Sequence, residues 1–305
     1  MIEIVKNTKI DFMGLKKYAF TASTLLVLLG LVGTVQIYRG KSNLGIDLAG
    51  GTSIQIRFQK PFALNEIRSV LTAAGHGEAT LQQVEGENVL LLKLRAQQAQ
   101  QERMVADPVI KLLREKLPGN PFVVESVSEI GPAIGHKLRQ DAALALAVAA
   151  LAIIVYLAWR FEFKFGVAAT IATFHDIFSI VGIFWIFGLE QDLLFITALL
   201  TIGGYSLTDT VVVFDRIREN IRLRKRATLS ETINLSVNEV LSRTIVTSVT
   251  VFLAVMALLF FGGSVLRNFA LALSIGIVVG TYSSVFVASP VVALWRGEKM
   301  TEVKR

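Results

Sequence analysis

Two aspartates lie inside stretches of the chain that are otherwise apolar. Asp176 falls in "ATFHDIFSIVG" and Asp209 in "GGYSLTDTVVVFD". An ionisable side chain within a membrane span costs roughly 2.5–3.5 kcal/mol on insertion scales and by default marks a functional site. A carboxyl group in such a place can take up and release a proton, so both aspartates are candidates for proton coupling.

Arg243, in "LSRT", is the predicted counter-charge of Asp209. Asp209 lies near the end of one apolar stretch and Arg243 at the beginning of the next, so we expect the two side chains to meet at the same depth. Two plainer interpretations stand beside this one. Arg243 is equally well explained as an anchor whose guanidinium reaches the lipid headgroups, and Asp209 as a structural partner that ties two helices together.

Polar and small residues surround the two aspartates. Residues three apart on a helix share a face, and this spacing or simple adjacency gives the supporting set: Thr173, His175, Ser179, Gly203, Gly204, Tyr205, Ser206 and Thr208. His175 is either a satisfied interior histidine or a proton relay, and Asp176 itself is either a packing residue or a functional one. The glycine pair predicts close helix approach or local bending.

Other chemistries lack their motifs. The chain has no cysteine, and its three histidines, His76, His136 and His175, are too scattered to predict a metal cluster. Gly40-Lys41-Ser42 resembles the end of a phosphate-binding loop, but the earlier glycine is missing because position 35 is Val35. No G-x-S-x-G or zinc signature occurs. The sequence therefore predicts no cofactor, no metal and no covalent catalysis.

The elements that position these residues are membrane helices. Of 305 residues, 53% are hydrophobic and 18% charged, and the mean hydropathy is +0.57, which indicates an integral membrane protein. Six apolar stretches are long enough to span a bilayer: 18–38, 142–159, 165–187, 193–214, 244–261 and 269–295. The first is too long for a signal peptide and has no clear cleavage site, so we interpret it as a retained span.

Lysine and arginine placement predicts the orientation. These residues gather before the first span, after the second, after the fourth and in the tail, whereas "GLEQD" has none and "GGSVLR" has only Arg267. Cytoplasmic loops carry such an excess, so both termini are predicted to be cytoplasmic. The net charge of +7 then reflects topology and does not indicate nucleic-acid binding.

This gives the predicted organisation of the chain. Residues 1–17 form a cytoplasmic segment, 18–38 the first transmembrane helix and 39–139 a periplasmic α+β domain. Residues 140–297 form a five-helix transmembrane region with a basic cytoplasmic loop at about 215–243, and 298–305 a cytoplasmic tail.

The periplasmic domain reads as strand, helix, strand, strand, helix, strand, which predicts a ferredoxin-like fold. Two strands are expected around the turn at residues 85–88. Asp107 is the predicted N-cap of the second helix, with Pro108 at its first position. The glutamine-rich stretch 96–103 extends that helix or forms a linker.

Two further patterns concern the membrane helices. "TLSETINLSVNEVL", residues 228–241, begins with a capping box and predicts either an amphipathic helix on the cytoplasmic interface or a continuation into the fifth span. The last span carries a small residue every fourth position: Ala272, Gly276, Gly280, Ser284 and Ala288. Such a stripe predicts close contact with another helix, of this chain or of another subunit.

Several stretches together resemble a known family. They are "IDFMGLKK", "GIDLAGGTSI", "SEIGPAIGHKL", "WRFEFKFG", "GYSLTDTVVVFDRIREN", "SVNEVLSRTIVTS" and "GTYSSVFVASP". In order and over nearly the whole chain they resemble the SecD/SecF family of the bacterial Sec translocase. The short chain and its single small outer domain resemble the SecF branch of that family.

The resemblance carries its own expectations. The family is similar in architecture to resistance–nodulation–division transporters and lies in the bacterial inner membrane. It implies SecD, the SecYEG channel, SecA, YajC, YidC and unfolded preprotein as partners, and the proton-motive force as the energy source. The family's charged pair corresponds to Asp209 and Arg243, and the aspartate of its His-Asp motif to Asp176.

Two positions depart from the family pattern. Thr208 stands where asparagine is usual, and Leu48 where phenylalanine is common. Our hypothesis from the sequence is that Asp209 responds to protons against Arg243 at an interface with SecD. The alternatives are a structural stabiliser of the SecD/SecYEG complex without proton coupling, and a small-molecule transporter of the same superfamily.

Overall fold

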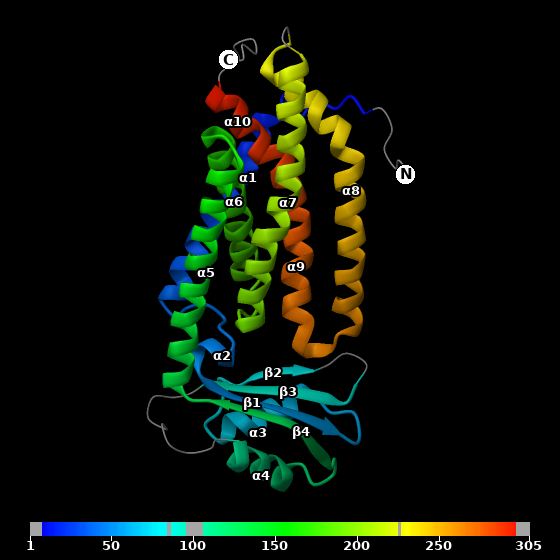
Figure 1. The fold of residues 1–305 in the computed structure, drawn as a ribbon. Helices are drawn as coiled ribbons and strands as arrows, with labels where there is room; N and C mark the ends of the chain where they lie inside the picture. Colours follow the sequence, from blue (N-terminus) through cyan, green and yellow to red (C-terminus); the bar gives the residue numbers. More distant parts are fainter. Residues whose placement is uncertain (1–7, 84–86, 96–105, 225–226, 297–305) are drawn as a thin grey trace. The chain divides into compact units, whose positions relative to one another are not determined.

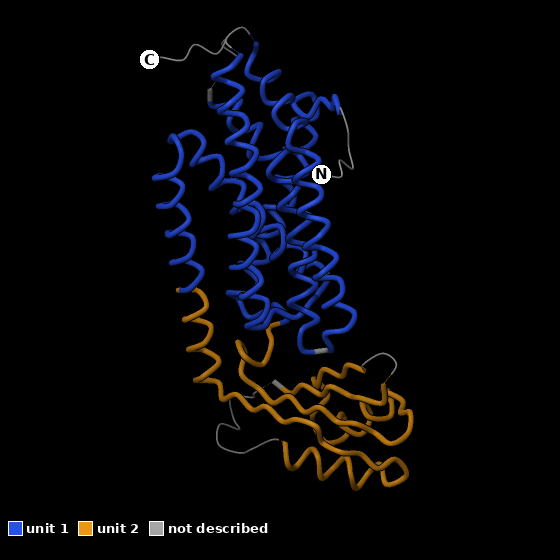
Figure 2. Tube along the Cα trace, turned by 45° about the vertical axis from the view of Figure 1, so that its right-hand side comes forward, with its two compact units in different colours: residues 1–43, 145–305 blue, residues 44–144 orange. Residues whose placement is uncertain are grey.

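In the computed structural model of the chain, residues 8–83, 87–95, 106–224 and 227–296 are described. Their contacts divide the chain into two compact units (Figure 2). The membrane unit comprises Met1–Asn43 and Ala145–Arg305, and the α+β unit comprises Leu44–Leu144. The boundaries that we predicted for the outer domain, 39 and 139, differ from this division by five residues at each end.

The described residues contain six helical stretches that are long and apolar enough to cross a membrane. They are α1 (Lys16–Tyr38), α5 (Pro132–Arg160), α6 (Phe163–Ile186), α7 (Leu193–Leu223), α8 (Leu229–Phe261) and Val265–Trp295. The last stretch consists of α9 (Gly263–Ser283), the π-helix η1 (Ser284–Ala288) and α10 (Ser289–Arg296). The six predicted spans are confirmed. In the membrane unit, the loops after α5 and α7 lie at the same end of the bundle as α10 (Figure 1).

Helix α8 decides between the two readings of residues 228–241. The hydroxyl of Thr228 accepts from the Glu231 amide at 3.2 Å, and the Glu231 carboxylate accepts from the Thr228 amide at 2.9 Å, which is the predicted capping box. From this cap α8 continues without a break to Phe261. The amphipathic stretch is therefore the first part of the fifth span, and no separate helix follows Thr228.

The sixth span changes its helical pitch where Pro290 follows Ser289. Proline has no amide hydrogen, and its ring crowds the carbonyl four residues earlier. A π-bulge relieves this conflict by widening the turn, and η1 lies directly before the proline. The hydroxyl of Ser289 donates to the Ser284 carbonyl at 2.9 Å, five residues back. This side-chain hydrogen bond gives a partner to the carbonyl of Ser284, the first residue of η1.

Glycines allow two close helix crossings in the membrane unit. An added Cβ at Gly30 of α1 would lie 2.1 Å from the Phe178 carbonyl oxygen of α6, and one at Gly182 of α6 would lie 2.7 Å from the Gly30 amide nitrogen. On α9, added Cβ atoms would lie 2.4 Å from Ile202 at Gly276 and 3.0 Å from Ser206 at Gly280. At these two positions the small-residue stripe packs against α7 of the same chain.

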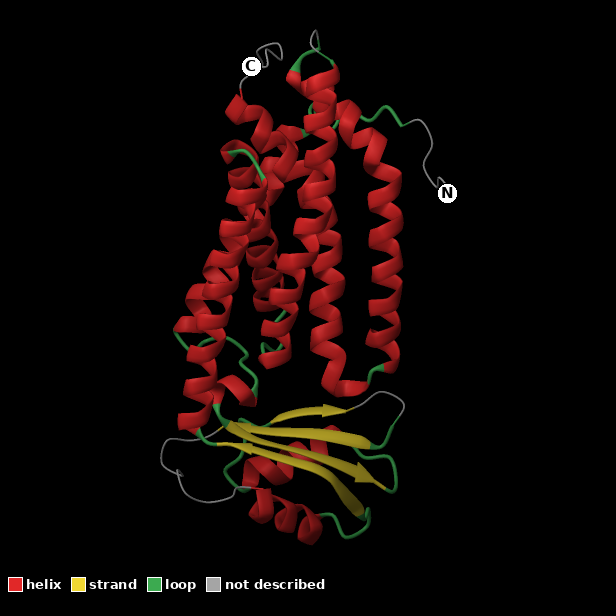
Figure 3. Ribbon diagram, viewed as in Figure 1, coloured by secondary structure: helices red, strands yellow, loops and turns green. Residues whose placement is uncertain are grey.

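The α+β unit is a four-stranded antiparallel sheet with two helices on one face (Figure 3). Its strands are β1 (Gly51–Phe58), β2 (Thr80–Gln83), β3 (Val89–Arg95) and β4 (Phe122–Ile130), in the order β2-β3-β1-β4. The helices are α3 (Leu64–Ala73) and α4 (Ala106–Lys116), and the short α2 (Ile46–Ala49) precedes β1. The ferredoxin-like prediction is confirmed, with a core that includes Ile54, Ile56, Leu90 and Leu92.

The N-cap prediction for α4 is wrong. Helix α4 already includes Ala106, so Asp107 and Pro108 lie inside its first turn. Both residue types are suited to that turn: a carboxylate is stabilised by the unpaired amides there, and proline has no amide to leave unpaired. The glutamine-rich stretch 96–103, the first two residues of the turn at 85–88 and the tail 298–305 lie outside the described residues.

Gly50, the residue directly before β1, has to be a glycine for steric reasons. Gly50 has φ +79° and ψ 147°, a conformation open essentially to glycine alone. An added Cβ at Gly50 would lie 3.0 Å from Pro132 Cα, and one at Gly135 would lie 2.7 Å from the Gly50 amide nitrogen. Leu48, on the turn before, is buried. The segment thus packs backbone to backbone against the beginning of α5.

Candidate functional site

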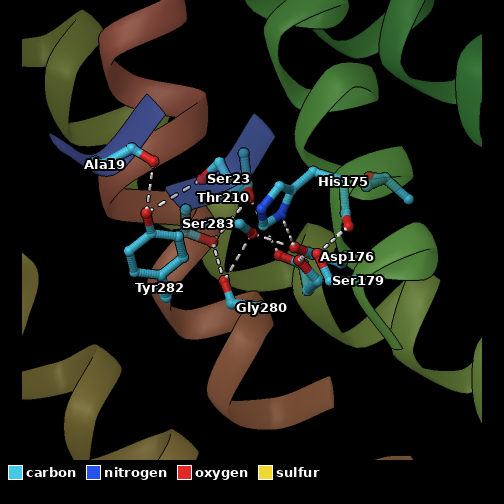
Figure 4. Close-up of polar contacts among 12 residues, drawn as sticks. Ala19, Ser23, His175, Asp176, Ser179, Thr210, Gly280, Tyr282 and Ser283 are labelled. Atoms are coloured by element: carbon cyan, nitrogen blue, oxygen red, sulfur yellow. Dashed lines mark hydrogen bonds and ion pairs between the residues drawn. The ribbon is translucent and has the colours of Figure 1, made fainter. Parts of the chain in front are cut away.

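Asp176 is fully buried at the centre of a polar cluster within the membrane unit, the Asp176 cluster, formed by His175, Asp176, Ser206 and Ser283 (Figure 4). The Oδ1 atom of Asp176 lies 2.9 Å from Nδ1 of His175. The Oδ2 atom accepts from Ser283 Oγ at 2.8 Å and also from Ser206 Oγ. Three helices, α6, α7 and α9, therefore meet on one carboxyl group.

Small residues and local bonds shape this meeting point. The hydroxyl of Ser283 also lies 3.1 Å from the Gly280 carbonyl, and Gly280 is where α9 approaches Ser206 most closely. One residue on, Ser284 Oγ lies 2.9 Å from Thr210 Oγ1. Buried hydroxyl groups thus line the contact of α7 with the end of α9 and with the first residue of η1.

The imidazole of His175 is only 3% exposed, and its second nitrogen, Nε2, has no hydrogen-bond partner among the residues that the structure describes. The nearby aromatic ring is Tyr282, with the two ring centroids 6.2 Å apart. The Tyr282 hydroxyl is already bonded to the α1 backbone, at 3.0 Å from the Ala19 carbonyl, and lies 3.1 Å from Ser23 Oγ. His175 thus has a hydrogen-bond partner at Nδ1 and, among the described residues, none at Nε2.

Asp209 is 7% exposed and belongs to a second group of side chains. Its Oδ2 atom accepts from Ser248 Oγ of α8 at 3.3 Å. Ser248 in turn lies 2.8 Å from Thr281 Oγ1 of α9 and 3.4 Å from the Tyr205 hydroxyl of α7. One hydroxyl group thus bonds this carboxyl group, and two more bond that hydroxyl. We call Asp209, Tyr205, Ser248 and Thr281 the Asp209 cluster.

The expected direct contact between Asp209 and Arg243 is not formed. Among the described residues no ion pair joins them: Arg243 is exposed, and Asp209 is bonded by Ser248 instead. Ser248 follows Arg243 by five residues, about 7.5 Å along α8 at ~1.5 Å per residue. Arg243 thus lies more than one turn along α8 from the residue that bonds Asp209.

The predicted supporting residues divide between the clusters. Tyr205 lies in the Asp209 cluster, whereas Ser206 bonds Asp176 on the neighbouring helix. Thr208 is exposed, and its hydroxyl lies 3.3 Å from the carbonyl of Gly204 in its own helix. An added Cβ would meet nothing within 4 Å at Gly204 and would lie 3.6 Å from Ile153 at Gly203, so neither glycine marks a close crossing.

Three members of the clusters were not predicted: Ser248, Thr281 and Ser283. Their signal is weak, because serine and threonine are common in membrane helices and often bond their own backbone. The run "TYSS" at 281–284 in the last span could have drawn attention, since four polar residues in succession cannot all face lipid. Within the described residues, no group of three or more acidic or histidine side chains could hold a metal ion.

Ion pairs tie the helices together at the end of the bundle that carries the basic loops. Arg216 of α7 donates to Glu239 of α8 at 2.7 Å and to Glu219 at 2.6 Å. Asn220, which is buried, donates to Glu239 at 2.6 Å. These bonds fix α7 against α8 on one side of the Asp209 cluster, as Ser248 does in the middle.

Comparisons with known proteins agree with this architecture. A family model described as "Protein export membrane protein SecD/SecF, C-terminal" matches residues 111–298, and one described as "SecD/SecF GG Motif" matches residues 43–62. The second match contains Gly50, whose backbone packs against the beginning of α5.

Curated relatives match the chain almost end to end. The protein translocase subunit SecF of Thermodesulfovibrio yellowstonii is 51% identical over 296 residues, which is 96% of this chain and 97% of the relative. The protein translocase subunit SecF of Pseudomonas aeruginosa is 35% identical over 291 residues, 95% of this chain and 92% of the relative.

Solved structures match as well. The crystal structure of SecDF, a translocon-associated membrane protein from Thermus thermophilus, superposes with a TM-score of 0.82 at 38% identity and covers 95% of this chain. A structure of SecDF in the super-membrane-facing form superposes with a TM-score of 0.70 at 37% identity. The present chain spans 39% of the length of each SecDF chain. From the family model and the near full-length relatives, the chain belongs to the SecD/SecF family of protein export membrane proteins and, within it, to the SecF translocase subunits.

Proposed function

We propose that this translocase subunit works with SecD to couple the proton-motive force to preprotein translocation and to release on the periplasmic side. As a transport component it does mechanical work and catalyses no covalent reaction. The observation that carries the proposal is the placement of Asp209, a nearly buried carboxyl group in a membrane span whose bonded neighbour is a hydroxyl and not a cation.

The environment of Asp209 suits reversible protonation. A carboxylate inside a membrane is costly unless it is paired, and Ser248 supplies one hydrogen bond at 3.3 Å without neutralising the charge. A proton on Asp209 removes the charge, and a hydroxyl accepts from the protonated form as readily as it donates to the ionised one. Moving one charge through 100 mV yields about 2.3 kcal/mol, so a few protons per cycle supply enough free energy for a domain movement.

Arg243 completes the proposal as a movable counter-charge. Its exposed position on α8, more than a turn from Ser248, leaves the guanidinium free to approach Asp209 or to withdraw. We infer that α8 faces SecD, so that a shift between the subunits changes the distance between the two charges. Asp176, held by three helices, then belongs to the part of the bundle that transmits the shift.

The location and the further partners are also proposals. The chain is a multi-pass membrane protein, and the bacterial inner membrane with both termini in the cytoplasm fits its lysine and arginine placement. The α+β unit would then face the periplasm, where an emerging preprotein leaves the channel. Membership of the family supports SecD as partner, and SecYEG, SecA, YajC and YidC as its neighbours.

The test is preprotein release from sealed vesicles that contain the channel, SecD and this subunit under an imposed proton gradient. We expect Asp209→Asn to assemble with SecD but to reduce release to the rate without a gradient. Thr208→Ala is the matched control, because its side chain is exposed on the neighbouring position of α7. If Asp209→Asn assembles and its release still responds to the gradient, the carboxyl group is structural and the subunit only stabilises the complex.

A further inference from the structure

We propose that Nε2 of His175, and not the carboxylate of Asp176, is the atom that takes up a proton in the Asp176 cluster. Its importance for translocation rests on the proposed function above, whereas the protonation itself can be tested independently. Two properties of the cluster support this assignment: the hydrogen-bond capacity of the two side chains and the net charge.

The carboxylate of Asp176 already has three donors. Nδ1 of His175 lies 2.9 Å from Oδ1, and the hydroxyls of Ser206 and Ser283 donate to Oδ2. Hydrogen bonds to the charged form of a carboxyl group favour that form. A proton on Asp176 would weaken all three of these bonds, because a neutral carboxyl group is a weaker hydrogen-bond acceptor than a carboxylate. The arrangement is therefore built for an ionised Asp176.

An ionised Asp176 fixes the state of the histidine. Because Oδ1 is an acceptor only, Nδ1 of His175 must carry its hydrogen, and the neutral ring leaves Nε2 as a bare acceptor. That atom is buried and has no donor among the described residues. A further proton on this vacant lone pair displaces no existing hydrogen bond of the cluster.

The charge of the cluster points the same way. With a neutral His175, the cluster carries one negative charge inside the membrane unit; with a protonated His175, it carries none. Among the described residues, the cluster's hydrogen bonds and ring contact involve no lysine or arginine: Tyr282 of α9 lies beside the His175 ring, Ser206 of α7 bonds Asp176, and Ala19 and Ser23 of α1 bond Tyr282. The next acidic residue on α7, Asp209, faces Ser248 one turn away. A proton on Nε2 therefore neutralises an otherwise unpaired buried charge.

The rival position for the proton is Oδ2 of Asp176. Ser283 Oγ also lies 3.1 Å from the Gly280 carbonyl and could turn its hydrogen there, which would free Oδ2 for a proton. In that state Asp176 would lose the hydrogen bond from Ser283, whereas protonation at Nε2 leaves all three bonds to Asp176 in place. A proton on Nε2 of His175 and a proton on Oδ2 of Asp176 give different nuclear magnetic resonance and infrared signals.

The chain offers a clean experiment because it has only three histidines. In the variant His76→Gln/His136→Gln, in which both altered histidines belong to the α+β unit, His175 is the single histidine. We would reconstitute the full chain in proteoliposomes, with and without SecD, and record 15N spectra of labelled histidine over a pH series. Infrared difference spectra of the same samples, with Asp176→Asn as reference, report the protonation of the carboxyl group.

We expect a ring with hydrogen on Nδ1 only at high pH, hydrogen on both nitrogens at low pH, and an ionised Asp176 throughout. Two results would overturn the proposal. One is a protonated-carboxyl band that is lost in Asp176→Asn while His175 stays neutral. The other is a ring that gains no second proton at any pH at which the protein remains folded.

Two substitutions of His175 extend the test to function. In His175→Asn the side-chain amide can take the place of Nδ1 toward Asp176 but cannot be protonated, and in His175→Gln the amide reaches the position of Nε2 instead. We expect His175→Asn to assemble with SecD and to lose the response of release to the gradient. A normal response in an assembled His175→Asn would remove His175 from the coupling. If neither the wild type nor Asp209→Asn responds to the gradient, the proposed function fails, and the spectra still decide where the proton lies.

Discussion

Ser206 and Asp209 lie three residues apart on α7 and bind different neighbours. Ser206 donates to Asp176 of α6, whereas Asp209 accepts from Ser248 of α8 at 3.3 Å. One turn of α7 thus carries a contact of both buried carboxyl groups. A rotation or shift of this turn that strengthens one contact must change the other, which is a physical basis for coupling between the two clusters.

The first prediction concerns Ser206. Ser206→Ala removes one of three donors to a fully buried carboxylate, which typically costs about 1–3 kcal/mol. We expect a lower free energy of unfolding in mild detergent, measured by denaturant titration of tryptophan fluorescence. Thr208→Ala, two positions along on the exposed face, should leave it unchanged within about 0.5 kcal/mol. Equal effects of the two substitutions would contradict the assignment of Ser206 to the Asp176 cluster.

The second prediction concerns the crossing of α1 and α6. Gly30→Ala places a methyl group at 2.1 Å from a backbone oxygen, so the helices must separate. Overpacking of this kind, with the backbone shifts that it forces, typically costs about 1–3 kcal/mol. We expect Gly30→Ala and Gly182→Ala to lower the melting temperature of the purified protein and its yield in membranes.

Gly204→Ala is the control for this crossing, because an added Cβ at Gly204 meets nothing within 4 Å. In a helix, alanine is favoured over glycine by roughly 0.5–1 kcal/mol, so this variant should be as stable as the wild type or more so. A Gly30→Ala protein as stable as Gly204→Ala would show that α1 does not pack against α6 at this depth.

Much of the fold could be predicted from the sequence because its signals are local. Apolar length gives the six spans, and the alternation of strands and helices gives the ferredoxin-like unit. The capping box at Thr228 and Glu231 was also visible, whereas the sequence left open whether the helix continues into the fifth span. Whether a helix continues depends on the absence of a helix-breaking residue over about thirty residues after the cap. Such an absence is a weaker signal than the cap itself.

The sites were predicted less completely, for a physical reason. A charged residue within an apolar stretch is easily recognised in a sequence, so Asp176 and Asp209 were predicted. Their partners are hydroxyl residues contributed by other helices, and the choice among many serines and threonines depends on helix rotation. Ser206 shows the difficulty: its spacing places it beside Asp209, yet its hydroxyl turns toward α6. The close contact at Gly280, which brings α9 to that place, appears in the sequence only as a packing stripe.

The third prediction concerns Gly50, the residue directly before β1. Gly50→Ala forces a side chain into a conformation with φ +79° and against Pro132 at 3.0 Å, and residues held in such a region cost about 1–3 kcal/mol. We expect faster proteolysis of the α+β unit in the intact, membrane-embedded chain. Gly119→Ala, where an added Cβ meets nothing within 4 Å, should be digested at the wild-type rate. Equal digestion of both variants would show that the backbone conformation at Gly50 does not require a glycine.

The last prediction concerns the segment before α1, which docks on α8. Asn238 exchanges two hydrogen bonds with the Ile10 backbone, at 3.0 and 2.9 Å, and Asn234 donates to Asp11 at 2.7 Å. Between these bonds Phe12 is buried against Phe286 of η1, with ring centroids 5.5 Å apart. The segment therefore connects α8 to the π-turn that follows Ser283.

Acid should loosen this connection. Hydrogen bonds from the Gly14 amide and from Asn234 hold the pKa of Asp11 below its ordinary value of 3.8. Because the folded-state pKa is the lower one, the contribution of Asp11 to stability is fully present above pH 3.8 and is lost as the pH falls through the folded value. In Asp11→Asn this pH-dependent part should be missing.

The measurement is the melting temperature of wild type and Asp11→Asn in detergent from neutral pH to below 3.8, where the difference between the two should shrink. Asn238→Ala is the matched variant without a charge: it removes bonds to Ile10 but leaves those of Asp11, so its deficit should stay constant with pH. A difference between wild type and Asp11→Asn that does not change with pH would mean that Asp11 holds the segment through its shape and not through its charge.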